Sequence, residues 1–226
     1  MNNNLHDVAV VELFENTVAD YLGTKYGISV SSNTDGIFLS LKYLIHCGKL
    51  KKGTAIDVPS RTFMSVPMSI IHANLKINFQ NIQWESFYRL APTNIYDAAL
   101  AFFRNMCVHY PKDIFVVSFQ YRKSLPIGKG GMIMTNDKNA RDYLVKARFN
   151  GRSIAHREPD MLGWSMYMTP EQAARGLTLF DSMDLRNSKI THARYSKGSA
   201  LYDNISSWKI WKNHKRTTKI AVRAQD

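Results

Sequence analysis

The feature that most constrains the fold is an alternation of short apolar runs with amphipathic segments. The run TAIDVP is followed by a helical pattern near residues 62–73 and then by a second apolar run, LKINFQ. A strand, a helix and a strand at this spacing form a βαβ unit, in which the two strands are parallel. YGISVSS, NIYD and DIFVVSF are further strand patterns, and GGMIMTND is expected to pair with DIFVVSF across a turn. The alternation predicts an α/β domain with a mainly parallel sheet.

Helical patterns flank these strands along the chain. Residues 8–22 form an amphipathic pattern, and residues 37–45 place apolar side chains on one helical face. In TPEQAARGLTLF, Thr169 is a predicted N-cap with Gln172 three positions later, which is the pattern of a capping box. A second long helix is expected over residues 184–203, so the last part of the chain is predicted to be helical.

The composition bounds the class of protein. The chain has 226 residues, of which 45% are hydrophobic, enough for one large domain or two small ones with a sizeable core. Cys47 and Cys107 are not part of a CxxC pair, so no zinc site or disulfide framework is indicated and a reducing compartment fits best. Acidic residues near the N-terminus argue against a signal peptide, and no apolar run approaches the ~20 residues that span a bilayer. We therefore expect a cytoplasmic protein without a metal centre or a membrane span.

Part of the formal net charge of +12 comes from the end of the chain. We interpret residues 206–226 as a solvated basic tail on a domain of residues 1–205. Nucleic-acid binding through this tail is an alternative, but no zinc-finger, helix-turn-helix or RNA-recognition signature accompanies it. An anionic small substrate would also suit the excess of positive charge. The basic residues of the tail are Lys209, Lys212, Lys215, Arg216, Lys219 and Arg223.

Two reactive side chains follow predicted strands. Lys123 comes after DIFVVSF, where partial burial would lower the pKa of its amine and make it a better nucleophile. Asp97 ends NIYD, and the carboxyl ends of strands in α/β sheets are where ligands bind. Taken alone, each has an ordinary structural interpretation: Lys123 as a solvated charge and Asp97 as a helix N-cap.

Two further features add to these side chains. Asn33 and Thr34 lie in SSNTDG, between a strand and a helix, where backbone N–H groups and hydroxyls can bind phosphate or merely cap the helix. Phe63 follows another strand and belongs either to the core or to a surface that stacks on a flat ring. Together with an amine and a carboxylate, these features describe a pocket for pyridoxal 5′-phosphate (PLP), which needs all four.

The order of the motifs resembles that of the DegT/StrS-type sugar aminotransferases, a PLP-dependent family of fold type I. The resemblance is collinear over about residues 8–200 and rests on VELFENTVADYLGTKYGISVSSNTDGI, VPSRTFMSVPMSI, DAALA, SFQYRK, GKGGMIMTND and LGWSMYMTPEQAARGL. It implies the three-layer large domain of fold type I. Between the strand pattern KINFQ and the Asp97 strand, where the family has a further strand and helices, this chain has only NIQWESFYRLAPT. That segment is too short for another βα unit. The C-terminal small domain of the family is also expected to be largely missing.

The resemblance implies a role for each matching residue. Lys123 matches the lysine that forms the Schiff base with PLP, and Asp97 matches the aspartate that pairs with the pyridine nitrogen. Ser118 matches a serine that binds the cofactor phosphate.

Four more positions carry implied roles in binding the cofactor. Asn33 and Thr34 match the phosphate-binding turn, Phe63 matches the ring that stacks on the cofactor, and Ser165 stands where the family has an asparagine that reaches the partner subunit's cofactor phosphate. Asn33 replaces a glycine of the family pattern, and Ser165 replaces that asparagine.

Three other residues also differ from the family pattern. Leu100 stands where the family has glutamine or histidine beside the cofactor, and Gln120 replaces a histidine two positions after Ser118. Asp35 adds a negative charge next to the predicted phosphate site.

The resemblance also implies an activity. The expected reaction transfers an amino group from an amino acid, with glutamate as the expected donor, to a keto-sugar that can be nucleotide-linked. Some relatives carry histidine at the position of Lys123 and act as sugar dehydratases, so lysine favours transamination. Because the sites of this family are shared between subunits, a homodimer is expected. The alternative, based on the missing segments, is a catalytically reduced member that serves as a binding or assembly module.

Overall fold

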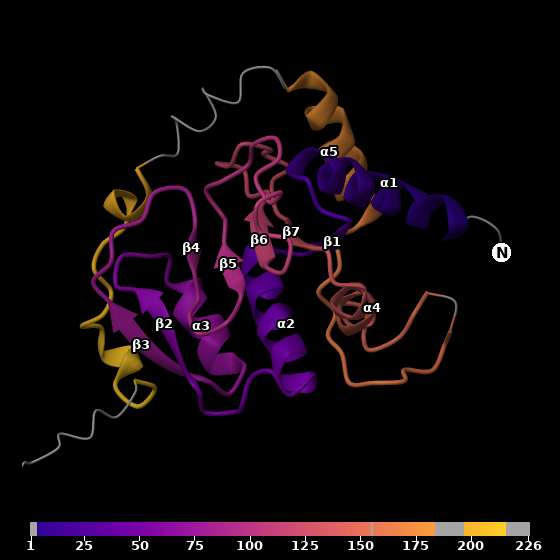
Figure 1. Ribbon diagram of the computed structural model, residues 1–226. Helices are drawn as coiled ribbons and strands as arrows, with labels where there is room; N and C mark the ends of the chain where they lie inside the picture. The colour runs from indigo at the N-terminus through magenta and orange to yellow at the C-terminus, as the bar shows by residue number, and fades with distance from the viewer. Residues whose placement is uncertain (1–3, 155, 184–196, 216–226) are drawn as a thin grey trace, which may run out of the picture.

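The computed structural model describes residues 4–154, 156–183 and 197–215, which form an α/β domain (Figure 1). The central sheet has five strands in the order β1 (Tyr26–Val30), β7 (Gly131–Thr135), β6 (Ile114–Ser118), β5 (Ile95–Asp97) and β4 (Tyr88–Arg89). Beside it, β2 (Ala55–Pro59) and β3 (Lys76–Gln80) form a parallel pair. The helices are α1 (Asn4–Leu22), α2 (Asn33–His46), α3 (Ser65–His72), α4 (Lys138–Ala147) and α5 (Pro170–Ser182).

Two hydrophobic cores lie on opposite faces of the sheet and define three layers. Strand β6 contributes to both, because successive side chains of a strand point to opposite faces. Ile114 and Val116 join the core that includes α2, α3 and α4, whereas Phe115 and Val117 join the core that includes α1 and α5. Burial on both faces explains why this strand is a continuous apolar run in the sequence. The expected three-layer arrangement is confirmed.

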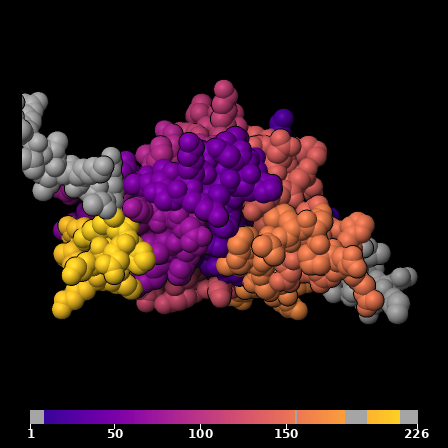
Figure 2. Space-filling view, turned by 90° about the horizontal axis from the view of Figure 1, so that it is seen from below, coloured from indigo at the N-terminus to yellow at the C-terminus, as the bar shows by residue number. Residues whose placement is uncertain are grey.

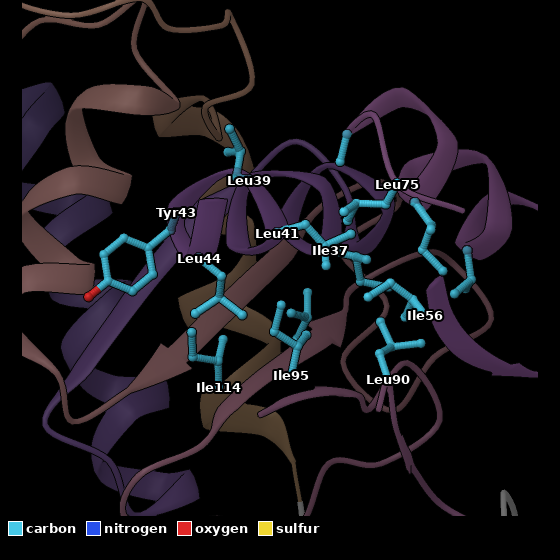
Figure 3. Close-up of a cluster of buried hydrophobic side chains, with 14 of the residues drawn as sticks. Ile37, Leu39, Leu41, Tyr43, Leu44, Ile56, Leu75, Leu90, Ile95 and Ile114 are labelled. Carbon is cyan, nitrogen blue, oxygen red and sulfur yellow. The ribbon is translucent and has the colours of Figure 1, made fainter. Parts of the chain in front are cut away.

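Helix α2 packs lengthwise against one face of the sheet. Figure 3 shows Ile37, Leu41 and Leu44 of this helix facing Ile95 and Ile114 of the strands below it. These helical residues recur at three- and four-residue spacing, so they form one apolar stripe. The packing fixes the N-terminus of α2 beside the ends of the central strands.

The five-stranded sheet is mixed, which corrects the prediction of a mainly parallel sheet. Strand β5 is parallel to β6, but β7 runs antiparallel to both of its neighbours, β1 and β6. Strands β4 and β5 also pair antiparallel. The segment NIQWESFYRLAPT therefore supplies one arm of a hairpin instead of a βα unit, as its length required. The predicted pairing of DIFVVSF with GGMIMTND is confirmed.

The helix termini follow the sequence signals only in part. The capping box of α5 is present, since Thr169 Oγ1 accepts from Gln172 N and Gln172 Oε1 accepts from Thr169 N. Of the helix expected over residues 184–203, residues 184–196 lie outside the described residues, and the described end contains a 3₁₀ turn, Gly198–Leu201. No helix of the described residues is long and apolar enough to cross a membrane.

A buried ion pair joins the first helix to the sheet. Arg148, directly after α4, pairs with Glu15 of α1, and its Nη1 also donates to Ser29 O at 2.6 Å and to Ser29 Oγ at 2.9 Å. Glu15 Oε1 accepts from Ser29 N at 2.8 Å and from Ser29 Oγ at 2.7 Å. Both charges are satisfied where they are buried, which is the condition for such a pair to be tolerated.

Residues 197–215, here called the C-terminal strap, run along the outer side of β2 and β3 (Figures 1 and 2). Trp211 is fully buried and its Nε1 donates to Ile205 O at 2.9 Å. Ile205 N donates to Ser60 O at 2.9 Å, and Ile77 N donates to His214 O at 3.0 Å. The predicted basic tail is therefore anchored to the domain as far as residue 215, while its lysines in this part are exposed. Residues 216–226 lie outside the described residues.

Candidate functional site

A cavity of about 430 Å³ opens where β5 and β6 end, beside the N-terminus of α2. Because these two strands are parallel, their carboxyl ends meet at one edge of the sheet, where α/β domains bind ligands. The structure brings six of the candidate residues to its wall: Asn33, Thr34, Phe63, Asp97, Ser118 and Lys123.

Asp97 is the last residue of β5 and is 5% exposed. Its Oδ2 accepts from the Tyr88 hydroxyl at 2.7 Å, and its Oδ1 accepts from Ala99 N at 3.1 Å and Asn33 Nδ2 at 3.2 Å. Burial raises the pKa of the Asp97 carboxyl above its ordinary value, while the Tyr88 and Ala99 donors and the charge of Lys123 oppose that rise. The interpretation of Asp97 as a helix N-cap is wrong, because no helix follows β5 among the described residues up to β6 and the contact with Ala99 N closes a turn. The carboxyl instead faces the cavity and interacts with the charge of Lys123.

Lys123 lies in the turn that follows β6. The backbone there is held by Lys123 N, which donates to Gln120 O at 2.8 Å, and by Arg122 N, which donates to Gln120 Oε1 at 2.9 Å. Burial lowers the pKa of the Lys123 amine below its ordinary value, and the negative charge of Asp97 offsets part of the change. A larger share of this amine is neutral than of a surface lysine, so it is better suited to act as a nucleophile or a base.

The N-terminus of α2 both caps the helix and faces the cavity. Ser32 is the N-cap, and its Oγ accepts from Asp35 N at 3.1 Å. The backbone N–H groups of Asn33 and Thr34 belong to the first turn, which has no acceptors within the helix. The Asp35 carboxylate in turn accepts from the hydroxyls of Ser31 and Ser32. Capping and anion binding are thus compatible here, with the Asp35 charge close to the same turn.

Close approach of β7 to α2 requires a glycine. A Cβ on Gly131 would lie 2.6 Å from Asn33 N and 2.7 Å from Ser32 C. The last glycine of GKGG therefore lets the first turn of α2 reach the cavity edge.

The Asn33 side chain does not point at a free anion position. Its Nδ2 donates to Val116 O at 2.8 Å and to Asp97 Oδ1 at 3.2 Å. The residue that replaces the family's glycine thus ties α2 to β6 and to the buried carboxylate. Any contribution of Asn33 to phosphate binding falls to its backbone N–H.

The remaining candidates divide between the cavity wall and the surface. Phe63, 53% exposed, lines the cavity as a flat apolar surface, and Leu100 and Gln120 also lie on the wall. Ser165 is exposed, forms an isolated antiparallel β-bridge with Phe149, and does not line the cavity. Its implied role concerned a partner subunit, so it stays a prediction.

Sequence reasoning missed three aromatic residues of the wall. Tyr88 comes from β4, Trp84 from the loop before it, and Tyr202 from the C-terminal strap. The Trp84 ring lies 4.6 Å from the Tyr88 ring and 5.8 Å from the Tyr202 ring, centroid to centroid. Burial raises the pKa of Tyr202 to about 12, with the Asp97 charge adding to the effect. Trp84 and Tyr88 are neighbours along the chain, but Tyr202 reaches them from a distant segment, and no local pattern in the sequence marks the three rings as one wall.

Among the described residues, no three His, Cys, Asp or Glu side chains gather in a way that could hold a metal ion. Charge and hydrogen bonding at the cavity thus come from Asp97, from basic side chains and from neutral donors. Of the basic side chains, Lys123, Arg122 and Lys129 line it.

Comparison with known proteins places this site in a family. The profile of the DegT/DnrJ/EryC1/StrS aminotransferase family matches residues 2–99 and 95–220. The GDP-perosamine synthase of Escherichia coli O157:H7 is 25% identical over an alignment of 217 residues, which covers 77% of this chain and 58% of that protein.

Solved structures share the fold. AtS13 from Actinomadura melliaura superposes with a TM-score of 0.66 at 20% identity, covering 76% of this chain and 60% of its own. The sugar aminotransferase CalS13 from Micromonospora echinospora gives a TM-score of 0.65 at 17% identity, covering 83% of this chain and 65% of its own. An E. coli GDP-4-keto-6-deoxy-D-mannose-3-dehydratase with bound hydrated PLP gives 0.63 at 18% identity, covering 76% and 60%.

These neighbours confirm the predicted fold type I. The chain spans about 58% of the length of the curated relative and about 60% of AtS13. The family profile nevertheless matches nearly the whole chain, in two adjoining parts that include every residue of the cavity wall. The chain therefore belongs to the DegT/DnrJ/EryC1/StrS aminotransferase family.

Proposed function

We propose that the cavity binds PLP and that the chain is an aminotransferase acting on a keto-sugar. The observation that carries the proposal is the meeting of a half-buried lysine amine and a buried carboxylate in one cavity beside a helix N-terminus. PLP is a ring with an aldehyde, a basic nitrogen and a phosphate, and each of these groups finds a matching chemistry here.

The residues present fit the cofactor. A cavity of about 430 Å³ is within the range that small-molecule sites occupy. Asp97 can hold a protonated ring nitrogen, and Phe63 offers a flat apolar face. The first turn of α2 and the Ser118 hydroxyl offer hydrogen-bond donors to the phosphate.

The residues of the chain have distinct tasks in this reaction. PLP supplies an electron sink for the carbanion at the substrate α-carbon. Lys123 would hold the cofactor through its aldehyde, and its amine would act as general base and acid, taking the proton from the substrate α-carbon and giving it to the carbon that carried the aldehyde. Asp97 keeps the ring nitrogen protonated through its negative charge. The aromatic wall limits access of water to the reacting atoms.

The proposal is tested by trapping the cofactor on the protein. Purified protein is incubated with PLP, reduced with borohydride, digested and analysed by mass spectrometry. We expect the label on the peptide that contains Lys123, and no label there in Lys123→Ala. Lys129→Ala is the matched control, because Lys129 lines the same cavity, and it should keep the label on Lys123. Labelling spread over surface lysines, unchanged by Lys123→Ala, would contradict the proposal.

Donor, acceptor and assembly follow as parts of the same proposal. Glutamate is the proposed amino donor, and the acceptor is a keto-sugar, with nucleotide-linked sugars included because cations line the cavity. We propose a homodimer in the cytoplasm, in which Ser165 of one subunit faces the cavity of the other. Light scattering measures the dimer, and conversion of bound PLP to its amine form by glutamate measures the first half-reaction. PLP binding without this conversion would favour the catalytically reduced alternative.

Asp35→Asn is expected to tighten PLP binding about fivefold at low salt. The Asp35 carboxylate sits in the first turn of α2, the turn proposed to bind the phosphate, and repulsion between such partly solvated charges is worth roughly 1 kcal/mol. The amide keeps an oxygen that can accept from Ser31 and Ser32. The free energy of unfolding should fall by about 0.5 kcal/mol, because an acidic residue in the first turn stabilises a helix. Calorimetric titration with PLP at low and high salt measures the effect, and a gain that persists unchanged at high salt would contradict an electrostatic cause.

A further inference from the structure

A chain of two hydrogen bonds leads to the buried carboxylate of the cavity. Tyr88 pairs directly with Asp97 in the β4–β5 hairpin, and its hydroxyl donates to Asp97 Oδ2 at 2.7 Å. The same hydroxyl lies 2.6 Å from Thr62 Oγ1. Because a phenol has one proton and Tyr88 gives it to Asp97, Thr62 donates to Tyr88.

The three side chains of this chain are withdrawn from water. Thr62 is 2% exposed, and Tyr88 and Asp97 are each 5% exposed. Hydrogen bonds in such surroundings are strengthened, and a partner left unpaired there is destabilised. Burial also raises the pKa of the Tyr88 phenol well above its ordinary value, so the phenol remains a donor at any pH of interest.

Apart from that of Tyr88, no hydrogen bond to Asp97 among the described residues reaches Oδ2. Ala99 N and Asn33 Nδ2 donate to Oδ1, whereas Tyr88 donates to Oδ2. Lys123, from the turn after β6, and Tyr202, from the C-terminal strap, interact with the carboxylate through charge. Tyr88 therefore fixes the second oxygen and, with it, the rotation of the carboxylate about its Cβ–Cγ bond.

We propose that Tyr88, supported by Thr62, is a positioning residue that orients Asp97 and keeps it ionised for the cationic ring of the cofactor. The proposal rests on the proposed function. A hydrogen bond that favours the carboxylate over the carboxylic acid opposes the effect of burial on Asp97. Without it, Asp97 takes up a proton at a higher pH and can no longer neutralise a ring cation.

The sign of the expected pH effect follows from this. Removing the Tyr88 hydroxyl raises the pKa of Asp97, so affinity for a cationic ring is kept at high pH and lost as the pH falls. The probe is pyridoxamine 5′-phosphate, which has no aldehyde and forms no bond with Lys123. The titrations of the free probe are the same for every variant. The ratio of the variant and wild-type dissociation constants therefore reports only the change in the protein's own protonation.

The experiment is calorimetric titration of the full chain with pyridoxamine 5′-phosphate across a range of pH. For Tyr88→Phe we expect a ratio near one at the alkaline end of the range that rises as the pH falls, by up to about tenfold for each unit by which the pKa of Asp97 is raised. Thr62→Val should shift the profile in the same direction by a smaller amount. It also keeps the proposal testable if Tyr88→Phe fails to fold.

Tyr96→Phe is the matched control. Tyr96 precedes Asp97 on β5, but its ring stacks on Phe115 at 4.7 Å, on the opposite face of the sheet. Its profile should follow that of the wild type. Asp97→Asn should bind weakly at every pH, because it lacks the charge that Tyr88 is proposed to maintain.

The outcomes separate the two levels of the proposal. Wild-type protein that binds neither PLP nor pyridoxamine 5′-phosphate would contradict the proposed function, and the role of Tyr88 with it. Binding by the wild type with an unchanged profile in Tyr88→Phe would contradict the role of Tyr88 alone. A uniform loss at every pH would also contradict it, since that is the result of a merely structural tyrosine.

Discussion

Replacement of Lys123 by alanine is expected to slow removal of the α-proton of glutamate about a thousandfold or more. A positioned general base contributes about 10²- to 10⁴-fold to such a step, and this lysine is the half-buried amine that faces Asp97. The rate is measured with PLP bound, as exchange of the α-proton of glutamate with deuterated solvent by NMR. Small primary amines added to Lys123→Ala should restore part of the rate, because they can replace the missing base.

Two further variants distinguish the base from the charge. Lys123→Arg keeps the positive charge, but a guanidinium does not give up its proton at these pH values and so should not restore exchange. Lys112→Ala removes an exposed lysine outside the cavity and should leave exchange unchanged. Exchange in Lys123→Ala at more than about a tenth of the wild-type rate would contradict the role of Lys123.

The parts of the site that the sequence predicted are those carried by local signals. Asp97, Ser118 and Lys123 each end or follow an apolar run, so the strand pattern by itself places them at one edge of the sheet. Asn33 and Thr34 follow from a strand–turn–helix junction. An amine, a carboxylate and a phosphate-binding turn at these positions then indicated PLP as the ligand, and the order of the motifs indicated the family.

The rest depended on contacts between distant segments. Tyr88 stands in a strand of two residues, too short for a periodic pattern, and its value comes from Thr62 and Asp97 on other segments. Tyr202 belongs to a region expected to be helical, and only the packing of the C-terminal strap brings it to the cavity. For β7, the pairing with β6 across a turn was predicted from the sequence. Its second antiparallel neighbour, β1, lies about a hundred residues away along the chain, and nothing local specifies that contact.

The C-terminal strap links stability to the site, and its anchor is Trp211. Trp211→Ala is expected to lower the free energy of unfolding by about 3–5 kcal/mol, because it removes a fully buried indole and leaves a cavity. Ile205 O would also lose the hydrogen bond from Trp211 Nε1. Urea unfolding measures the loss. Trp208→Ala is the matched control from the same segment, since Trp208 is 39% exposed, and it should cost less than about 1 kcal/mol.

Trp211→Ala should also disturb the cavity wall while leaving Lys123 in place. The strap reaches the wall through Arg61 Nη1, which donates to Tyr202 O at 2.9 Å, and through Ser199 N, which donates to Trp84 O at 2.9 Å. A Cβ on Gly198 would lie 1.9 Å from Trp84 O, so the strap and this loop touch at a point where only glycine fits.

If Trp211 holds this contact, Trp211→Ala protein that is still folded should bind PLP more weakly and be cut by proteases within residues 197–215. The borohydride label should remain on Lys123, because the turn after β6 is held by its own hydrogen bonds. Unchanged affinity together with rapid cleavage would mean that Tyr202 lies at the wall without contributing to binding. Loss of the label itself would mean that the strap supports the catalytic turn, which none of its described contacts predicts.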